Sequence, residues 1–243
     1  MENQDKINEP ITVAGALLDR FLELGFYRMM QTVFTTDDCI NTQKGEVYDV
    51  FWLRILLQPI KNVTQHKIFK KNKDFEVTIT KAKFNKEIDD LYERYRLSMN
   101  FEAHESIHYF LFGSEKKVVF QTKMIQIRHH GKLIAGGYFD EGKESIAGIL
   151  NFYDPDYGKY SLGKFLMLLK IQYAQQRGMV YYYPGYLALD TPKFDYKVFP
   201  SEEVVEVLVK QEENTWFPFI KIGKQGLERY GFWHNCKITL GID

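Results

Sequence analysis

The sequence has few cysteines. Only Cys39 and Cys236 occur among its 243 residues. Two thiols are too few for a disulfide framework or for a four-ligand metal site within one chain. Reduced thiols in a cytoplasmic protein are the simplest interpretation. We therefore expect a cytoplasmic protein with no structural disulfide and no resident metal.

The chain also lacks a long apolar run and an excess of either charge. No stretch approaches the roughly 20 apolar residues that span a bilayer. The first six residues are polar and acidic, unlike a signal peptide. Basic and acidic residues number 32 each, so the formal net charge is zero. We expect no membrane partner, and any contact with RNA must come from a local basic patch.

Aromatic residues, in contrast, are abundant at 16%, and the hydrophobic content of 45% is typical of a soluble globular protein. Period and turn residues predict both helices and strands, which indicates an α+β fold. The turn His129-His130-Gly131 joins two of the strands as a hairpin, and adjacent turn residues point apart, which disfavours a metal site at the histidines. The predicted helices are 17–24, 87–101, 107–112, 161–177 and 204–210; the predicted strands are 32–36, 47–59, 75–79, 118–127, 132–139, 146–153 and 179–183, while 216–223 and 232–240 are expected to be strands or irregular.

Residues 146–186 form the most informative stretch. An apolar run over 146–153 predicts a buried strand, and Asp154-Pro155-Asp156-Tyr157-Gly158 has the composition of a turn. Helical spacing begins at Ser161 and ends at Gly178, a typical C-terminal cap. The first amides of this helix would face the end of the preceding strand, which suits an anion or a polarised carbonyl. The alternative is an ordinary N-cap serine followed by a packing glycine.

Several short motifs follow one another in this part of the chain. They are F-Y-D-P-D at 152–156, S-L-G at 161–163, Y-Y-Y-P-G-Y at 181–186, F-D-Y-K at 194–197, and Pro200. Their order and spacing resemble the C-terminal half of the aminoacyl-tRNA–protein transferases, the arginyl and leucyl transferases that extend protein N-termini. The resemblance implies a GNAT-like (acyl-CoA N-acyltransferase-like) mixed sheet with flanking helices over residues 81–243. It also implies a smaller N-terminal α/β subdomain over residues 1–80, which here lacks the family's cysteine cluster because Cys39 alone remains in that region.

The resemblance implies a reaction as well. An amino acid, arginine or leucine, would pass from charged tRNA to the N-terminal amine of acceptor proteins or peptides that begin with Asp or Glu, marking them for degradation. Aminoacyl-tRNA would be a co-substrate, no further cofactor is expected, and the protein is expected to be a monomer. The N-terminal amine needs little help to lose its proton, because its ordinary pKa is about 7.7–8.0. Positioning and oxyanion stabilisation should then provide most of the rate.

The same resemblance suggests roles for individual residues. Asp154 and Tyr153 are the catalytic candidates, the aspartate to orient or deprotonate the amine and the tyrosine to position substrate. Arg128 or Lys197 would bind the acidic side chain of the acceptor. The alternatives are a plain turn aspartate and, for the tyrosines, core packing. The remaining substrate-binding candidates are Ser161, Leu162, Gly163, Lys164, Tyr186 and Tyr196.

A basic segment over residues 59–72 resembles an arginine-rich segment of the family. Lys67, Lys70 and Lys71 recur at helical spacing near Phe69, so they would share a face that contacts tRNA phosphates. The alternative is a solvated charged helix.

Two other functions compete with the transferase. An N-acyltransferase that uses acyl-CoA would carry a Q/R-x-x-G-x-G/A loop before the helix, and residues 156–163 lack that pattern. A non-catalytic relative that binds acidic N-termini or tRNA is the other alternative, favoured by the missing cysteines.

Overall fold

The computed structural model describes residues 11–41, 44–59, 63–99, 103–115, 117–199 and 201–240. Residues 60–62 of the predicted basic segment, the last two residues of the helix predicted over 87–101, and Pro200 lie outside these ranges.

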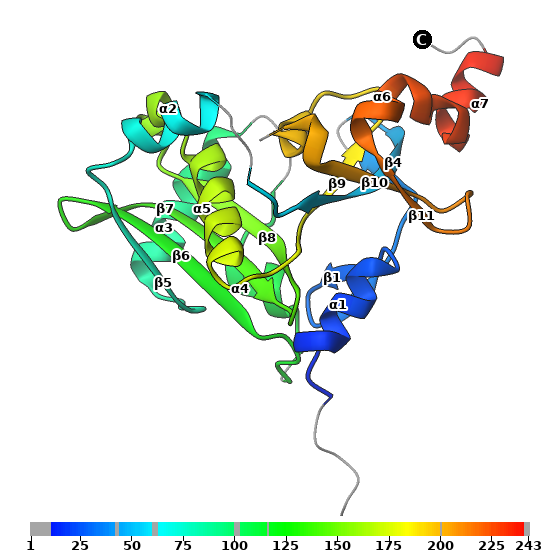
Figure 1. Cartoon of the computed structure of the whole chain (residues 1–243). Coiled ribbons are helices and arrows are strands. Elements are labelled where there is room, and N and C mark those ends of the chain that lie inside the picture. The colour runs from blue at the N-terminus through cyan, green and yellow to red at the C-terminus, as the bar shows by residue number, and fades with distance from the viewer. Residues whose placement is uncertain are drawn as a thin grey trace, which may run out of the picture.

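One mixed sheet of nine strands organises the described residues (Figure 1). Every neighbouring pair is antiparallel except β8 and β9, which are parallel. A separate hairpin joins β1 (Tyr27–Met29) to β2 (Thr32–Phe34). The order in the sheet is β11 (Thr215–Pro218), β10 (Val205–Val209), β4 (Glu46–Leu56), β9 (Tyr181–Ala188), β8 (Ser145–Tyr153), β7 (Lys132–Glu141), β6 (Thr122–His129) and β5 (Glu76–Lys81), with β3 (Asp38–Asn41) paired to β4.

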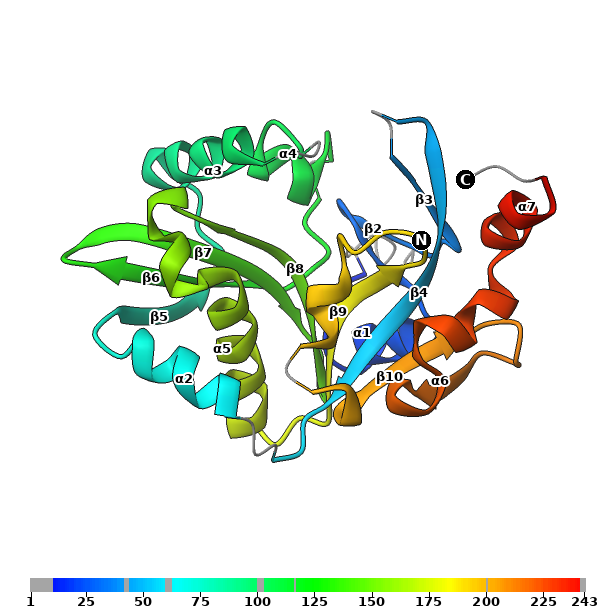
Figure 2. The same ribbon diagram turned by 90° about the horizontal axis from the view of Figure 1, so that it is seen from above.

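Helices cover both faces of the β6–β8 region (Figure 2). On one face lie α3 (Lys86–Ser98) and α4 (Ile107–Phe112), whose apolar side chains pack on Tyr138 and Phe152. On the other face lies α5 (Leu162–Gln176), buried along most of its length, with α2 (Val63–Lys71) against it. The long apolar face of α5 builds the main core with Ile125, Ile134 and Phe139 of the sheet.

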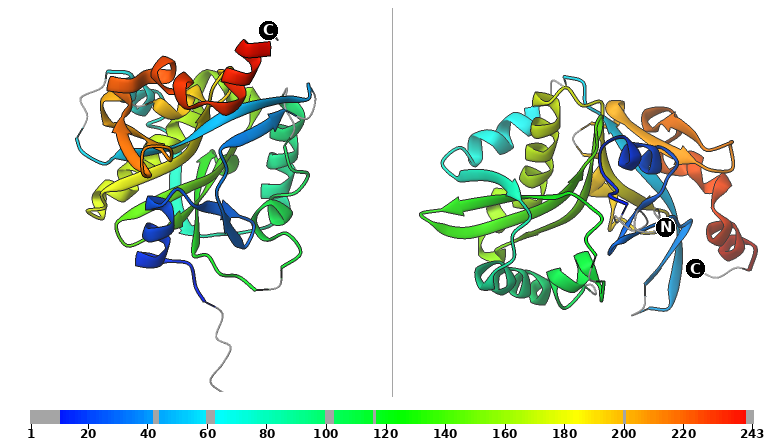
Figure 3. Two further views of the ribbon diagram at one scale, coloured as in Figure 1. Left: turned by 90° about the vertical axis from the view of Figure 1, so that its right-hand side faces the viewer. Right: turned by 90° about the horizontal axis from the view of Figure 1, so that it is seen from below.

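In the left-hand view of Figure 3 the N-terminal helix lies low and the C-terminal helices lie at the top, whereas the right-hand view shows both on the same half of the molecule. Helix α1 (Gly15–Glu23) lies beside β8, while α6 (Phe219–Leu227) and α7 (Phe232–Leu240) pack near β10 and β4. Short 3₁₀ turns complete the chain: η1 (Pro155–Tyr160), η2 (Asp195–Val198), η3 (Glu202–Val204) and η4 (Glu228–Tyr230). None of the helices described has both the length and the apolarity needed to cross a bilayer.

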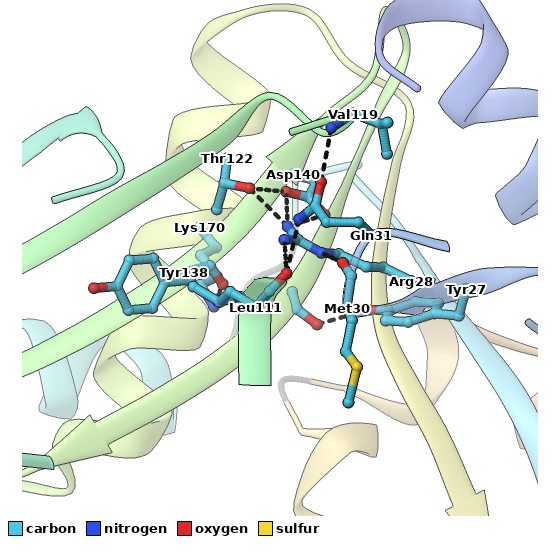
Figure 4. A network of polar contacts seen from close by, with 11 residues as sticks. Tyr27, Arg28, Met30, Gln31, Leu111, Val119, Thr122, Tyr138, Asp140 and Lys170 are labelled. Atoms are coloured by element: carbon cyan, nitrogen blue, oxygen red, sulfur yellow. Dashed lines mark hydrogen bonds and ion pairs between the residues drawn. The ribbon is translucent and has the colours of Figure 1, made fainter. Parts of the chain in front are cut away.

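A buried polar network ties the N-terminal hairpin to the sheet (Figure 4). The guanidinium of Arg28 donates to the Asp140 carboxylate, to the Thr122 hydroxyl and to the carbonyl oxygen of Leu111. On the other side of Asp140, the Lys170 ammonium donates to the Tyr138 carbonyl at 2.8 Å, and burial lowers the pKa of Lys170 to about 7. Buried donors of this kind are paired because an unpaired one is costly.

The α+β class, the strand–turn–helix–strand unit and the hairpin at 129–131 are confirmed. Three element predictions are wrong in whole or in part, and one of them is 216–223, whose second half lies in helix α6 and is neither strand nor irregular. Residues 204–210, predicted as a helix, contain strand β10, because their β-branched side chains pair between β4 and β11. Residues 232–240, expected to be a strand or irregular, are helix α7. Its first amides, those of Trp233 and His234, donate to the carboxylate of Asp49 on β4. This cap comes from a distant part of the chain, so local pattern does not reveal it.

The sheet draws strands from both sides of the boundary predicted near residue 80. Strand β4 lies between β10 and β9, and β5 pairs with β6. The division into 1–80 and 81–243 stays a prediction.

Candidate functional site

The parallel strands β8 and β9 pair only at their beginnings. Residues 145–147 lie beside 181–183, after which β8 follows β7 and β9 follows β4 (Figure 2). The hydroxyl of Tyr27 lies where the pairing ends and shares its proton between the carbonyl oxygens of Gly148, at 2.7 Å, and Tyr183, at 2.6 Å. A Cβ at Gly148 would lie 2.5 Å from the Tyr182 hydroxyl, so glycine is required there. We call this divergence the β8/β9 fork.

Helix α5 begins beside the end of β8. Ser161 precedes it in the left-handed conformation, with φ of 55°, and its side chain makes no capping hydrogen bond. Left-handed backbone is uncommon for a non-glycine residue. The first amides of α5 have no partner within the helix. Leu162 is buried. Gly163 lies against the ring of Tyr153: a Cβ added at Gly163 would lie 3.4 Å from Cε1 of Tyr153. The predicted contact between the helix start and the strand end is therefore present, but the serine cap is not.

Asp154 is buried at the junction of β8 and η1, and its carboxylate is fully engaged. Its Oδ2 accepts from Lys132 at 2.9 Å and from Arg94 at 3.1 Å, and its Oδ1 accepts from the Asp156 amide at 3.2 Å. Burial alone would raise the pKa of Asp154, but the hydrogen bonds from Lys132 and Asp156 and the charge of Arg94 outweigh it, so the pKa is lowered. A carboxylate held in this way is a weak base.

Tyrosines gather around the fork from four elements. The rings of Tyr95 on α3 and Tyr153 on β8 meet edge to face at 5.0 Å. Burial raises the pKa of Tyr95, and the neighbouring Tyr153 and Tyr196 add to the shift. The turn η2, which carries Tyr196, packs against β9. Tyr196 still exposes 51% of its surface. Tyr186 on β9 packs against Trp52, and burial raises its pKa to about 12.

Lys197 follows Tyr196 and extends its ammonium toward β9. The Nζ donates to the carbonyl oxygen of Tyr186 at 2.8 Å and lies over the rings of Tyr186 and Phe194. Burial lowers the pKa of Lys197 to about 7. Among the described residues no carboxylate pairs with it. An enclosed ammonium without a counter-ion is a candidate site for an anionic group.

Arg128 makes its hydrogen bonds to residues outside the fork. Its two terminal nitrogens bind the carboxylate of Glu87 on α3 at 3.0 and 2.6 Å, and Nη1 also donates to the Gly131 carbonyl. Arg128 is thus already neutralised. Lys164 is exposed near the start of α5, with its ammonium 4.9 Å from the centre of the Phe199 ring.

The three lysines predicted to bind tRNA are all exposed on α2. On its other side, Ile68 is buried and Phe69 packs edge to face on Phe165 of α5. Helix α2 therefore presents a basic face from a fixed position next to α5. No ion pair joins Lys67, Lys70 or Lys71 to any residue that the structure describes.

Sequence reasoning missed Tyr27, Gly148 and Tyr95. Gly148 lies inside an apolar strand run, a position where glycine indicates close approach of another group. That signal was available, whereas Tyr27 and Tyr95 reach the fork only through packing. In the described ranges, no group of three or more His, Cys, Asp or Glu side chains is placed to hold a metal.

Two hollows lie away from the fork, on the side of β4 and β10. The smaller, of about 150 Å³, is lined by Asp49, Trp52 and Lys210 among others, and the larger is an open depression beside Tyr230 and Phe232. Neither contains a predicted site residue, so the fork remains the candidate site.

Known proteins resemble this chain over the region of the fork. Residues 87–204 match the family model "Arginine-tRNA-protein transferase, C terminus". The chain is 29% identical over 214 residues to the aspartate/glutamate leucyltransferase of Leptospira interrogans, covering 85% of this chain and 80% of that protein. It is 39% identical over 79 residues to arginyl-tRNA–protein transferase 1 of Saccharomyces cerevisiae, covering 32% of this chain but 16% of that protein.

Solved structures are more distant. The ribosomal-protein-S18-alanine N-acetyltransferase of Escherichia coli superposes with a TM-score of 0.31 at 20% identity, over 43% of this chain and 63% of that one. This likeness is too weak to support a conclusion about activity. The family match and the curated relatives agree, and over residues 87–204 the chain is similar to the aminoacyl-tRNA–protein transferases.

Proposed function

We propose that this protein transfers an amino acid from charged tRNA to the N-terminal amine of proteins or peptides that begin with Asp or Glu. The observation that carries the proposal is the family match over residues 87–204, which includes both strands of the fork. The names of its relatives, leucyl and arginyl transferases, supply the class of reaction.

The arrangement of the site supports a GNAT-like architecture as part of this proposal. A helix precedes an antiparallel hairpin, which leads into a strand, a turn, a helix and a parallel strand that diverges from the first. Beyond residues 147 and 183 the two strands no longer pair with each other, and we place the substrates along these diverging edges.

The reaction is aminolysis of an ester. The nitrogen of the acceptor amine attacks the carbonyl carbon of the aminoacyl ester, a C–N bond forms, and the C–O bond to the ribose breaks. The nitrogen loses one proton, and the ribose oxygen leaves with one. No net redox change occurs, so no cofactor besides aminoacyl-tRNA is needed.

Helix α5 is placed to stabilise the oxyanion. The amides of residues 162–164 have no partner in the helix and are adjacent to Tyr153 at the end of β8. Preorganised amide donors commonly contribute a factor of roughly 10²–10³ in rate. Tyr153, Tyr186 and Tyr196 then hold the two substrates in the fork.

We assign Asp154 an orienting role in place of proton abstraction. Its lowered pKa and its bonds to Lys132 and Arg94 make it a poor proton acceptor. They also fix the end of β8, from which Tyr153 projects. A base is not essential, because the amine itself deprotonates at an ordinary pKa of about 7.7–8.0.

Lys197 is the better of the two candidates for binding the acidic side chain of the acceptor. Arg128 is already bound to Glu87, whereas the enclosed Lys197 ammonium has only a carbonyl partner. An incoming carboxylate would supply the missing counter-charge, and the interaction would be strong in this partly desolvated place.

Other parts of the proposal concern the protein as a whole. We assign residues 1–80 to an N-terminal subdomain and residues 81–243 to the transferase domain, and we place the protein in the cytoplasm as a monomer.

The test is a direct assay of transfer. The protein is incubated with a mixture of charged tRNAs and with peptides that begin with Asp, Glu or Met, and products are read by mass spectrometry. We expect a mass increase of one leucine or arginine on the Asp and Glu peptides alone. Transfer from acyl-CoA but not from tRNA, or binding without transfer, would overturn the proposal.

A further inference from the structure

Four aromatic side chains gather where α2, the β6–β7 hairpin and η1 meet. They are Phe75, His129, Tyr157 and Tyr160, which we call the aromatic cluster. The ring of Phe75 lies 4.9 Å from Tyr160 and 5.1 Å from His129, and the two tyrosine rings lie 5.8 Å apart. All four are half-buried, so each packs on the core while keeping part of its surface open.

Hydrogen bonds hold this cluster in place. Nδ1 of His129 lies 3.1 Å from the Tyr157 hydroxyl. Asn72, at the end of α2 and 2% exposed, donates from Nδ2 to the Tyr160 carbonyl at 3.1 Å. Because three separate elements contribute rings, the cluster is preorganised and loses little conformational freedom on binding.

Exposed lysines without an ion-pair partner in the described ranges lie on the segments that carry or adjoin the cluster. Elsewhere, by contrast, Lys86 pairs with Asp90, Lys123 with Glu141 and Lys210 with Asp37. The exposed lysines next to the cluster have no such partner among the described residues, and they outnumber the exposed acids Asp74, Glu76 and Asp156 of the same segments. They are Lys67, Lys70 and Lys71 on α2, Lys73 after it, Lys159 in η1 and Lys164 in α5.

The cluster also leads directly to the fork. Tyr160 is followed by Ser161 and the first turn of α5, where the ester carbonyl would be attacked. A polyanion bound along α2 would thus reach the site by passing over the cluster.

We propose that the aromatic cluster is a stacking platform for the unpaired 3′-terminal nucleotides of tRNA, with the lysines on either side holding their phosphates. This inference rests on the proposed function and names the part of the substrate that this surface binds. Aromatic platforms flanked by positive charge are the common way to hold single-stranded nucleic acid, because every base has a face that stacks. Positive charge without aromatic rings would suit a duplex equally well, so the rings select the unpaired end.

The test measures binding of two RNAs: an intact tRNA and the same tRNA lacking its unpaired 3′-terminal nucleotides. The variant is Tyr160→Leu, and Tyr160→Phe keeps the ring. A stacked base contributes enough that Tyr160→Leu should weaken binding of intact tRNA at least about five-fold. It should leave the trimmed tRNA unaffected, and Tyr160→Phe should bind both like the unmodified protein. Tyr109→Leu, at an exposed tyrosine on α4, is the matched control and should bind both RNAs normally.

The outcomes separate this inference from the proposed function. If Tyr160→Leu and Tyr160→Phe both bind intact tRNA normally, or if the loss is equal for the trimmed tRNA, the stacking platform is wrong even though transfer continues. Thermal midpoints for each variant show that it is folded. If the unmodified protein transfers no amino acid but the binding pattern is as described, the platform stands and the transferase proposal fails.

Discussion

The guanidinium of Arg28 and the carboxylate of Asp140 form an ion pair at 2.9 Å, although 112 residues separate them in the chain. Both side chains are buried, and every nitrogen of Arg28 has an acceptor. The pair joins the hairpin that carries Tyr27 to β7, the strand next to β8. It therefore helps to hold Tyr27 in position at the fork.

Breaking this pair should destabilise the protein strongly. Arg28→Met leaves a buried carboxylate with Thr122 as its remaining partner, and loss of one member of a buried pair typically costs about 3–5 kcal/mol. Denaturant unfolding measures the change. Arg20→Met removes an exposed pair with Glu23 and should cost less than about 1 kcal/mol. Equal losses for the two variants would contradict the structural role of Arg28.

Tyr27→Phe tests the fork. The change removes one hydroxyl and leaves the carbonyls of Gly148 and Tyr183 without this donor, which should cost about 1–3 kcal/mol of stability. Because the strands are then free to shift, transfer should fall more than stability alone explains. Unfolding and single-turnover rates on one preparation measure both. The exposed Tyr109→Phe is the control, and a Tyr27→Phe protein with normal stability would show that the hydroxyl does not hold the fork.

Asp154→Asn should lower stability at neutral pH. The folded-state pKa of Asp154 is lowered, so its ionised form stabilises the fold above its unfolded pKa of about 3.9, and this contribution is lost as pH falls through the lower folded value. The difference in unfolding free energy between the variant and the original should therefore shrink below about pH 4. If orientation of β8 is its role, turnover should drop without rescue at high pH. Full rescue at high pH would instead indicate a proton acceptor.

Binding of an Asp-initiated peptide should weaken as pH rises through about 7. The Lys197 ammonium loses its proton near that pH, and with it the charge that attracts the acceptor carboxylate. A Met-initiated peptide has the same titrating amine without the carboxylate, so it corrects for the amine. Lys197→Met should abolish the preference for Asp, whereas Lys221→Met at an exposed position should not. An unchanged preference in Lys197→Met would exclude this residue from acceptor recognition.

The α2 lysines should govern the salt dependence of tRNA binding. Changing Lys67, Lys70 and Lys71 together to Ala should weaken binding and reduce the logarithmic salt slope by up to roughly two units, at about 0.7 per single-strand phosphate contact. Affinity at several salt concentrations measures the slope. The exposed lysines at 81, 83 and 143 form a matched control triple. If both triples behave alike, the α2 face is an ordinary solvated surface.

The unit from β8 to β9 was predictable because its signals are local. An apolar run, a Pro- and Gly-containing turn and a three- and four-residue spacing each act within a few residues, and the short motifs on that unit carry the resemblance to the transferases whose family model matches residues 87–204. The same local logic failed at β10 and α7. The β-branched residues of β10 pair with strands on both sides. Helix α7, which starts at Phe232, is capped by Asp49, 183 residues earlier in the chain.

Sequence alone therefore determined the class of fold, the central unit and the resemblance to the transferases, since these depend on the order and period of neighbouring residues. Only the tertiary structure decided which charges are free. Asp154 and Arg128 were candidates at the sequence level, yet Lys132, Arg94 and Glu87 neutralise them from other elements. Lys197 became the candidate because rings from β9 and the preceding loop enclose its ammonium. The reactivity of a charged group depends on the solvent and charges around it, and packing brings those together from distant parts of the chain.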